Sequence, residues 1–185
     1  MATSTRRSTG ESSSDQAGGG QAGGNRRPGS PRSSAQERFV LGAQAVGLTP
    51  DVLRFPAGTR TAEQAAAAVG CALGQIVKSL VFLCDGRPVL ALTSGANRVD
   101  TKELGELLGG PIVRADADDV RDATGYAIGG TPPFGHVRPL RAVADRTLLN
   151  YDTVWAAAGT PDTVFELTPD ELVRASGATV ADFAA

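Results

Sequence analysis

Residues 75–93 of the chain read QIVKSLVFLCDGRPVLALT. The part from Ile76 to Cys84 is an apolar run with β-branched and aromatic residues, and Lys78 is its only charged residue. Asp85-Gly86 separates this run from a second apolar run, Val89–Thr93. Two apolar runs joined by Asp-Gly predict a β-hairpin. Because polar residues are nearly absent from both runs, we expect the hairpin to lie in the core of a sheet.

Helix-start signals lie on both sides of this hairpin. Capping boxes, in which Ser, Thr or Asp precedes an acid or amide by three residues, are accompanied by Gly at the expected helix ends. They predict helices that begin at Ser34, Thr61, Asp100 and Thr168, and the acids early in Asp116–Asp122 favour a further helix start there. Short strands are predicted at 52–55, 112–113, 140–143, 153–157 and 163–167.

The connections between these elements decide the fold class. Several are turns, such as Gly159-Thr160-Pro161-Asp162, and are too short for crossover helices. This favours a single mixed α/β domain over a doubly wound parallel sheet. We expect a mostly antiparallel mixed sheet with flanking helices, and we expect the sheet to close into a barrel-like core.

The first residues of the chain differ sharply from the rest. Residues 1–35 contain no Val, Ile, Leu, Phe, Trp or Tyr and are rich in Gly, Ser and Arg. We therefore predict a disordered tail at 1–34 and a folded domain at 35–185, which is about 47% apolar. The tail carries a net charge of +3, so it is either an inert solvated segment or a weak electrostatic arm for an RNA backbone.

Charge and cysteine content exclude several classes of protein. The whole chain has a net charge of −2, which argues against a basic surface wrapped around nucleic acid but not against a local basic pocket. No apolar run is long enough for a membrane span, and the N-terminus has no signal-peptide core. Cys71, Cys84 and a single His do not make a zinc site, and two lone cysteines fit a reducing cytoplasm. We therefore expect no structural zinc site and a cytoplasmic location.

Lys78 is the most informative polar residue. The chain has 16 Arg but only two Lys, so Arg is its default cation. A compact ammonium whose pKa can shift offers different chemistry from a guanidinium. From the residues alone, Lys78 is either a pocket cation or a strand lysine that extends into water.

A second candidate feature is the segment 125–135, which holds four Gly and two Pro and predicts no regular element. Its free amides could hold an oxyanion or a phosphate, or the segment could be a rigid turn. His136 follows it and is either a substrate hydrogen-bonder or a structural residue. Arg98 is a weak candidate for a pocket wall.

Three other features favour structural interpretations. Cys71 and Cys84 are expected to be small core residues. The acids between Asp116 and Asp122 lack the spacing of a calcium loop and are expected to form a solvated helix face. Trp155 and Tyr151 are expected in the core or at its rim. No nucleophile elbow, phosphate-binding loop or dinucleotide fingerprint is present.

The chain resembles the YbaK-like aminoacyl-tRNA deacylases, which are similar to the editing domain inserted in bacterial prolyl-tRNA synthetases. The resemblance covers about two-thirds of the chain in consistent order. It runs through 76–82, 100–104, 124–126, 129–135, 158–159 and 167–172. The family's lysine and its Gly-x-x-x-Pro loop correspond to Lys78 and to Gly129–Pro133.

This resemblance implies a barrel-like α/β fold and hydrolysis, in trans, of the ester between a wrong amino acid and its tRNA. Water is the usual nucleophile, aided by the substrate, and no cofactor or metal is used. The implied partners are a mischarged tRNA and, as an open question, an aminoacyl-tRNA synthetase; no membrane is involved. Lys78 is the expected catalytic residue, and the expected substrate-binding residues are Ser79, Gly129, Gly130, Thr131, Pro133, Gly135, His136, Ala158 and Gly159.

Two departures bear on the substrate. Members specific for Cys carry a Ser before the Ala-Gly turn and an Asp after it, where this chain has Ala157 and Val164. A less polar site disfavours Cys-tRNA(Pro) and favours a small amino acid on a tRNA(Pro)-type substrate. Two alternatives stay open at this point: a non-catalytic module that binds the tRNA end or a synthetase, and an unrelated small-ester hydrolase.

Overall fold

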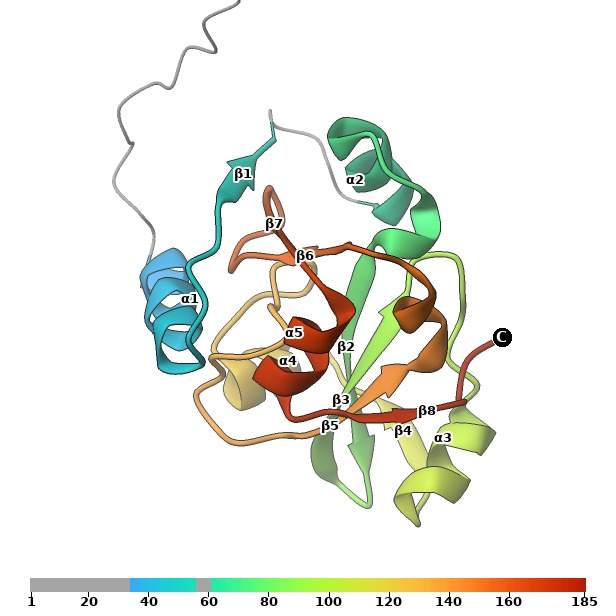
Figure 1. Ribbon diagram of the computed structural model, residues 1–185. Coiled ribbons are helices and arrows are strands. Elements are labelled where there is room, and N and C mark those ends of the chain that lie inside the picture. Colours follow the sequence, from blue (N-terminus) through green and yellow to red (C-terminus); the bar gives the residue numbers. More distant parts are fainter. Residues whose placement is uncertain (1–33, 56–60) are drawn as a thin grey trace, which may run out of the picture. The chain divides into compact units, whose positions relative to one another are not determined.

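A computed structural model describes residues 34–55 and 61–185 (Figure 1). The predicted disordered tail therefore lies outside the described residues, except for Ser34, which is the first residue of helix α1. The described part is a mixed α/β domain with two sheets.

The larger sheet is built on the predicted hairpin. Strands β2 (Val77–Cys84) and β3 (Arg87–Ser94) pair antiparallel from Val77↔Ser94 to Cys84↔Arg87. Asp85 and Gly86 both have positive φ, 48° and 72°, which is the geometry of a type I′ turn. The hairpin prediction is thus confirmed.

Three shorter strands complete this sheet, in the order β4-β2-β3-β5-β8. Strand β4 (Ile112–Arg114) is antiparallel to β2, whereas β5 (Arg141–Asp145) is parallel to β3. Strand β8 (Thr179–Ala181) is parallel to β5 and was not predicted from the sequence. Its three residues carry too little pattern to predict a strand, and only the neighbouring β5 edge makes them one.

The smaller sheet has the order β1-β7-β6 and is antiparallel throughout. It consists of β1 (Val52–Arg54), β6 (Val154–Ala157) and β7 (Thr163–Leu167). A single parallel bridge, Ile76↔Trp155, joins it to the start of β2.

The predicted barrel closure is wrong: within the described residues, neither sheet closes on itself. Closure requires the two edge strands to pair along their length at a fixed stagger. The edges of the larger sheet, β4 and β8, are only three residues long and do not pair with each other. The β6–β7 hairpin instead forms its own sheet with β1.

Each helix begins at its predicted start or one residue after it. The described helices are α1 (Ser34–Ala45), α2 (Ala62–Val69), α3 (Thr101–Leu108), α4 (Ala117–Thr124) and α5 (Pro169–Ser176). Thr61, Asp116 and Thr168 form reciprocal capping boxes, and Asp100 caps α3 through its carboxylate. None of the described helices has the length and hydrophobicity needed to cross a bilayer.

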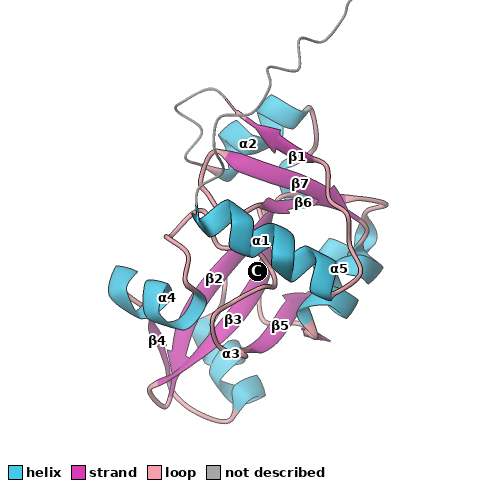
Figure 2. Cartoon of the chain, turned by 90° about the vertical axis from the view of Figure 1, so that its left-hand side faces the viewer, coloured by secondary structure: helices cyan, strands magenta, loops and turns pink. Residues whose placement is uncertain are grey.

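The core lies on both faces of the larger sheet because side chains alternate along each strand. Val77 and Val81 face a cluster that also contains Phe39 of α1 and Phe165 of β7. Phe82 faces the opposite cluster, which α3 covers. Figure 2 shows α1 lying in front of the strands and α3 at the lower end of the domain. Residues of β2 therefore point to two different environments.

Candidate functional site

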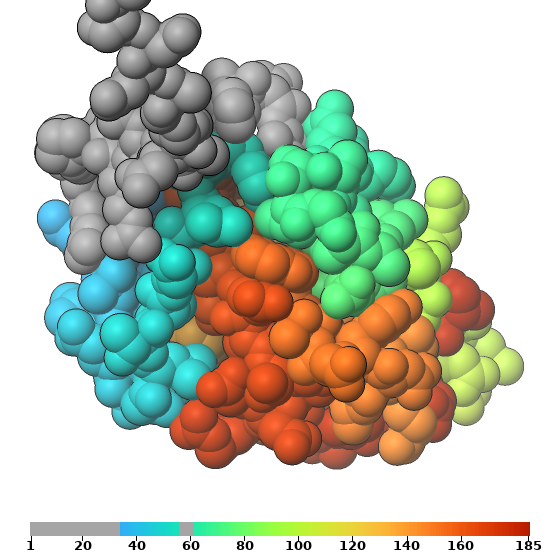
Figure 3. All heavy atoms as spheres, turned by 45° about the horizontal axis from the view of Figure 1, so that its top comes forward, coloured from blue at the N-terminus to red at the C-terminus, as the bar shows by residue number. Residues whose placement is uncertain are grey.

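A pocket of about 630 Å³ lies along the open edge of β2. Strand β4 pairs only with Phe82–Cys84, so no described strand covers the outer edge of residues 78–80. Helix α2 and the β6–β7 hairpin border this gap, and they pack together through Ala65, Ala66 and Val164 (Figure 3). The pocket thus occupies the space that a neighbouring strand would fill.

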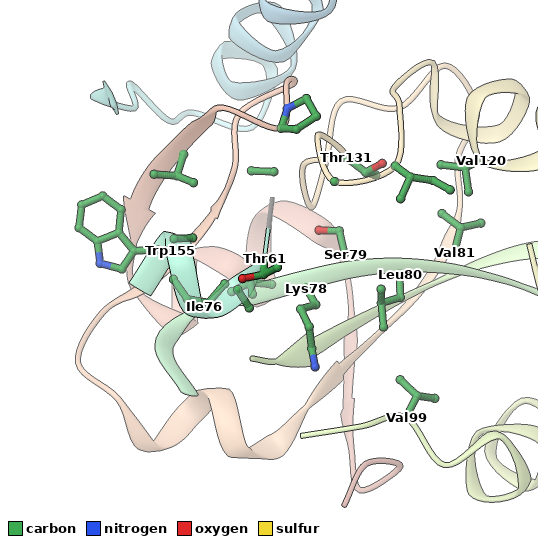
Figure 4. A pocket seen from close by; sticks show the side chains of 18 of the residues that line it. Thr61, Ile76, Lys78, Ser79, Leu80, Val81, Val99, Val120, Thr131 and Trp155 are labelled. Carbon is green, nitrogen blue, oxygen red and sulfur yellow. The ribbon is translucent and has the colours of Figure 1, made fainter. Parts of the chain in front are cut away.

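The strand divides this pocket into two sides. Ser79 and Val81 point toward Thr131 and Val120, whereas Lys78 points the opposite way, toward Val99 (Figure 4). The alternation of side chains along β2 is the cause. A ligand in this pocket can contact both sides because they meet at the exposed strand edge.

Lys78 is held in place by the segment that follows β3. Its Nζ donates to the Gly95 carbonyl at 3.2 Å and to the Asn97 carbonyl. An ammonium has three donors, so one N–H remains for a ligand. Burial lowers the pKa of Lys78, an effect that Arg98 adds to and that Glu63 and Asp145 oppose. A lysine extending into water, the alternative considered above, does not describe this arrangement.

The charged residues that line the pocket are all positive. Lys78, Arg98 and Arg114 line it, and no described lining residue is a carboxylate. The chain as a whole carries a net charge of −2, so the pocket is a local exception. Such a site favours an anionic ligand, and a pocket with low-dielectric walls strengthens this attraction.

Ser79 has a hydroxyl without a partner. Its Oγ is buried and forms no hydrogen bond with the described residues. Leaving a buried hydroxyl unsatisfied costs about 1–3 kcal/mol. Because Ser79 lines the pocket, a ligand there could satisfy this hydroxyl.

Only part of the glycine- and proline-rich loop reaches the pocket. Gly129 and Thr131 line it together with Lys78 and Ser79. Gly129 has a φ of 84°, a conformation that Gly adopts without strain. The structure thus brings four of the ten predicted site residues to one cavity.

The other six predicted residues are not among those that line the pocket: Gly130, Pro133, Gly135, His136, Ala158 and Gly159. Instead, close backbone packing surrounds several of them. A Cβ on Gly130 would lie 2.8 Å from the Cα of Thr160, and one on Gly159 would lie 2.9 Å from the Ala35 carbonyl. These glycines therefore allow the loop, the β6–β7 turn and α1 to approach one another.

His136 forms a hydrogen bond with the same loop. Its Nε2 lies 2.8 Å from the Pro132 carbonyl, and because a carbonyl only accepts, Nε2 carries the hydrogen. The ring also meets Tyr126 edge-on, with centroids 6.2 Å apart. Burial lowers the pKa of His136, and the bond to Pro132 only partly opposes this.

This pKa shift predicts a pH dependence of stability. In the unfolded chain, His136 becomes protonated when the pH falls below its ordinary pKa of 6.5. In the folded chain, its pKa is lower, so it becomes protonated only at a lower pH. The free energy of unfolding should therefore fall as the pH drops from 6.5 through the folded-state pKa. Melting curves between pH 5 and 7.5 should show this loss, and His136→Gln, which keeps an N–H donor, should reduce it. Parallel curves for the two proteins would contradict the prediction.

Sequence reasoning missed several lining residues. Arg114, Val120 and Ile128 belong to the pocket wall. No local pattern distinguishes Arg114 from the chain's other arginines. Arg98, a weak candidate from the sequence, does line the pocket. Trp155 packs at the edge of a core cluster, as expected, and also lines the pocket.

The remaining side chains follow the structural interpretations. Cys84 is a buried core residue, and Cys71 packs against the cluster beneath α2. In the acidic segment, Asp116 caps α4. Nowhere in 34–55 or 61–185 do His, Cys, Asp or Glu side chains gather in a group able to hold a metal ion.

The chain is similar to aminoacyl-tRNA editing domains and to proteins that contain this region. Residues 56–175 match the model of the aminoacyl-tRNA editing domain. The uncharacterised protein YwhH of Bacillus subtilis (strain 168) is 34% identical over 123 residues, 66% of this chain and 78% of that protein. A proline–tRNA ligase of Maridesulfovibrio salexigens is 35% identical over 101 residues, 54% of this chain but only 17% of the ligase.

A solved structure is similar over nearly its whole length. It was provisionally assigned as a trans-editing enzyme for prolyl tRNA synthetase. Its identity to this chain is 46%, its TM-score is 0.80, and the match covers 84% of this chain and 99% of that one.

Proposed function

The chain belongs to the family of aminoacyl-tRNA editing domains, and we propose on this premise that it hydrolyses the ester of a mischarged tRNA in trans. The observation that carries the proposal is the pocket at the β2 edge. It combines a held ammonium and two guanidiniums with an uncharged wall on the other side of the strand. The 3′ end of an aminoacyl-tRNA likewise combines phosphates with an amino-acid side chain.

The reaction needs little from the protein beyond positioning and charge stabilisation. Water attacks the ester carbonyl, an oxyanion forms, and the bond to the ribose oxygen then breaks as that oxygen takes a proton. The free N–H of Lys78 stabilises negative charge on the substrate's phosphate or carbonyl oxygen. No described lining residue is a His or a carboxylate that could activate Ser79, so water is the nucleophile.

The uncharged wall supports a preference for a small, uncharged amino acid. Ala157 and Val164 line the pocket at the two positions that are polar in the Cys-specific proteins, and Val120 and Ile128 extend the same apolar surface. A thiol would find no polar partner at either position. We therefore propose a small, uncharged amino acid other than Cys, carried on a tRNA(Pro)-type substrate, with a prolyl-tRNA synthetase as the enzyme whose errors are corrected.

A deacylation screen tests this proposal. Purified full-length protein is incubated with a panel of tRNAs carrying Ala, Ser, Cys or Pro, and the ester that remains is measured over time. We expect fastest turnover for a small mischarged amino acid on tRNA(Pro) and little turnover of Pro-tRNA(Pro). Binding without turnover of any substrate would instead support a non-catalytic tRNA-end module. Equal turnover of simple amino-acid esters would support a small-ester hydrolase.

A further inference from the structure

Three polar residues form a row across the larger sheet. Lys78 on β2 is registered opposite Thr93 on β3. The parallel register Leu92↔Ala144 continues to place Thr93 beside Asp145 on β5. All three share the strand face that carries Phe82 and Val143. A cation and an acid therefore lie on the same face of adjacent strands, separated by one buried threonine.

Asn97 connects the two ends of this row. Its side-chain Nδ2 donates to Asp145 Oδ2 at 2.9 Å and also lies 2.9 Å from Thr147 Oγ1. Its backbone carbonyl accepts a hydrogen bond from Lys78 Nζ. One residue thus binds the acid with its side chain and the ammonium with its main chain.

The carboxylate of Asp145 is buried and accepts hydrogen bonds from Ser94 and Asn97, at and just after the end of β3, and from Thr147. Asp145 is only 2% exposed. Besides Asn97, it accepts from the Ser94 amide at 3.1 Å and from the Thr147 amide at 2.9 Å. Ser94 and Asn97 flank Gly95, whose carbonyl is the second acceptor of Lys78. Both acceptors of the ammonium therefore lie on a segment that Asp145 anchors at two points.

We propose that Asp145, acting through Asn97, is a positioning residue that directs the free N–H of Lys78 into the pocket. With two N–H groups bound to fixed carbonyls, the ammonium cannot rotate, and its third donor has one direction. The inference rests on the proposed function of Lys78. It goes beyond that function because Asp145 and Asn97 do not line the pocket.

Asp145 could affect Lys78 only through its negative charge rather than by positioning it. Glu63 is the control for this possibility because it is a second carboxylate near Lys78. The charged groups that face Lys78 are Glu63 near the start of α2, Arg98 after β3, and Asp145 on β5. Glu63 acts on Lys78 through charge, whereas Asp145 also holds the segment that carries its acceptors. Glu63→Gln therefore removes a negative charge without breaking the Asn97 bridge.

The experiment uses lysine labelled with ¹³C at Cε in the full-length protein. The chain has only two lysines, and exposed Lys102 is an internal reference. Asn97→Ala, Asp145→Asn and Glu63→Gln are compared with the parent by NMR titration and by steady-state deacylation. All three variants should leave the Lys102 signal unchanged.

We expect Asn97→Ala and Asp145→Asn to shift or broaden the Lys78 signal. We also expect them to lower kcat about tenfold or more, equivalent to about 1.4 kcal/mol, at a pH where Lys78 is still protonated. Glu63→Gln should lower the Lys78 pKa but leave kcat at that pH nearly unchanged. If Asp145→Asn does not fold, the Asn97→Ala variant alone tests the inference. Asn97 is only half-buried, so we expect this variant to fold.

Two results would overturn the inference. One is a folded Asn97→Ala variant with the parent's Lys78 signal and kcat. The other is a loss of kcat in Glu63→Gln equal to that in Asp145→Asn, which would make charge the whole effect. If the parent itself deacylates nothing, the proposed function fails, but the NMR arm still shows whether Asn97 and Asp145 hold the ammonium.

Discussion

Lys78→Ala is expected to lower kcat/KM at least about tenfold on the preferred mischarged tRNA. A charge-assisted hydrogen bond contributes about 1.5–3 kcal/mol, which corresponds to roughly 10- to 150-fold in rate. Lys78 is only half-buried, so its removal should change the melting temperature little. Steady-state deacylation and a thermal melt on the same preparations measure the two effects.

Two further variants test whether the geometry of Lys78 matters as well as its charge, and whether the effect is specific to this lysine. Lys78→Arg keeps the charge, but a planar guanidinium cannot make the same two bonds to Gly95 and Asn97, so it should recover only part of the activity. Lys102→Ala removes the chain's other lysine from an exposed site on α3 and should behave like the parent. If Lys78→Ala and Lys78→Arg both deacylate at the parent's rate, the hydrolase proposal loses its central residue.

Gly130→Val is expected to abolish turnover in a domain that still folds. Gly130 does not have a positive φ, so the cause is contact rather than backbone strain. Any Cβ at this position would lie 2.8–2.9 Å from main-chain atoms of Thr160. The loop must therefore move away from the β6–β7 turn, and Gly129 and Thr131 move with it out of the pocket wall. Overpacking of this kind costs about 1–3 kcal/mol, less than the usual stability of a domain.

A glycine far from the pocket is the matched control for this loss. Gly177 ends α5 with a φ of 63°, and a Cβ there would meet nothing within 4 Å. Gly177→Ala should therefore lower stability by roughly 1–2 kcal/mol through strain alone and leave deacylation unchanged. Circular dichroism and turnover are measured for both variants. Parent-like activity in folded Gly130→Val would mean that the loop is only a turn.

Local sequence signals predicted the secondary structure well. The Asp85-Gly86 turn, the capping boxes at Thr61 and Thr168, and the glycines that end helices all act within a few residues. Their physical causes, positive φ and unsatisfied backbone donors, do not depend on the rest of the fold. Such features can be predicted from one sequence.

The candidate site was predictable only in part. Lys78 stood out because an apolar strand rarely carries a charge, and the density of Gly and Pro marked the loop. The sequence could not show which face of the loop meets a ligand. In the structure Gly129 lines the pocket, whereas the adjacent Gly130 packs on Thr160, which lies 30 residues away.

The amino-acid sequence by itself therefore determined the hairpin, the helix ends, the Lys78 position and the resemblance that led to the family. Only the tertiary structure decided that two sheets form rather than a barrel, and that β4 leaves the edge of β2 open. It also decided that the Asn97 carbonyl accepts from Lys78 while the Asn97 side chain donates to Asp145. The reason is the separation, along the sequence, of the residues that interact. Turns and caps depend on near neighbours, whereas strand pairing and a buried network depend on residues brought together from distant segments.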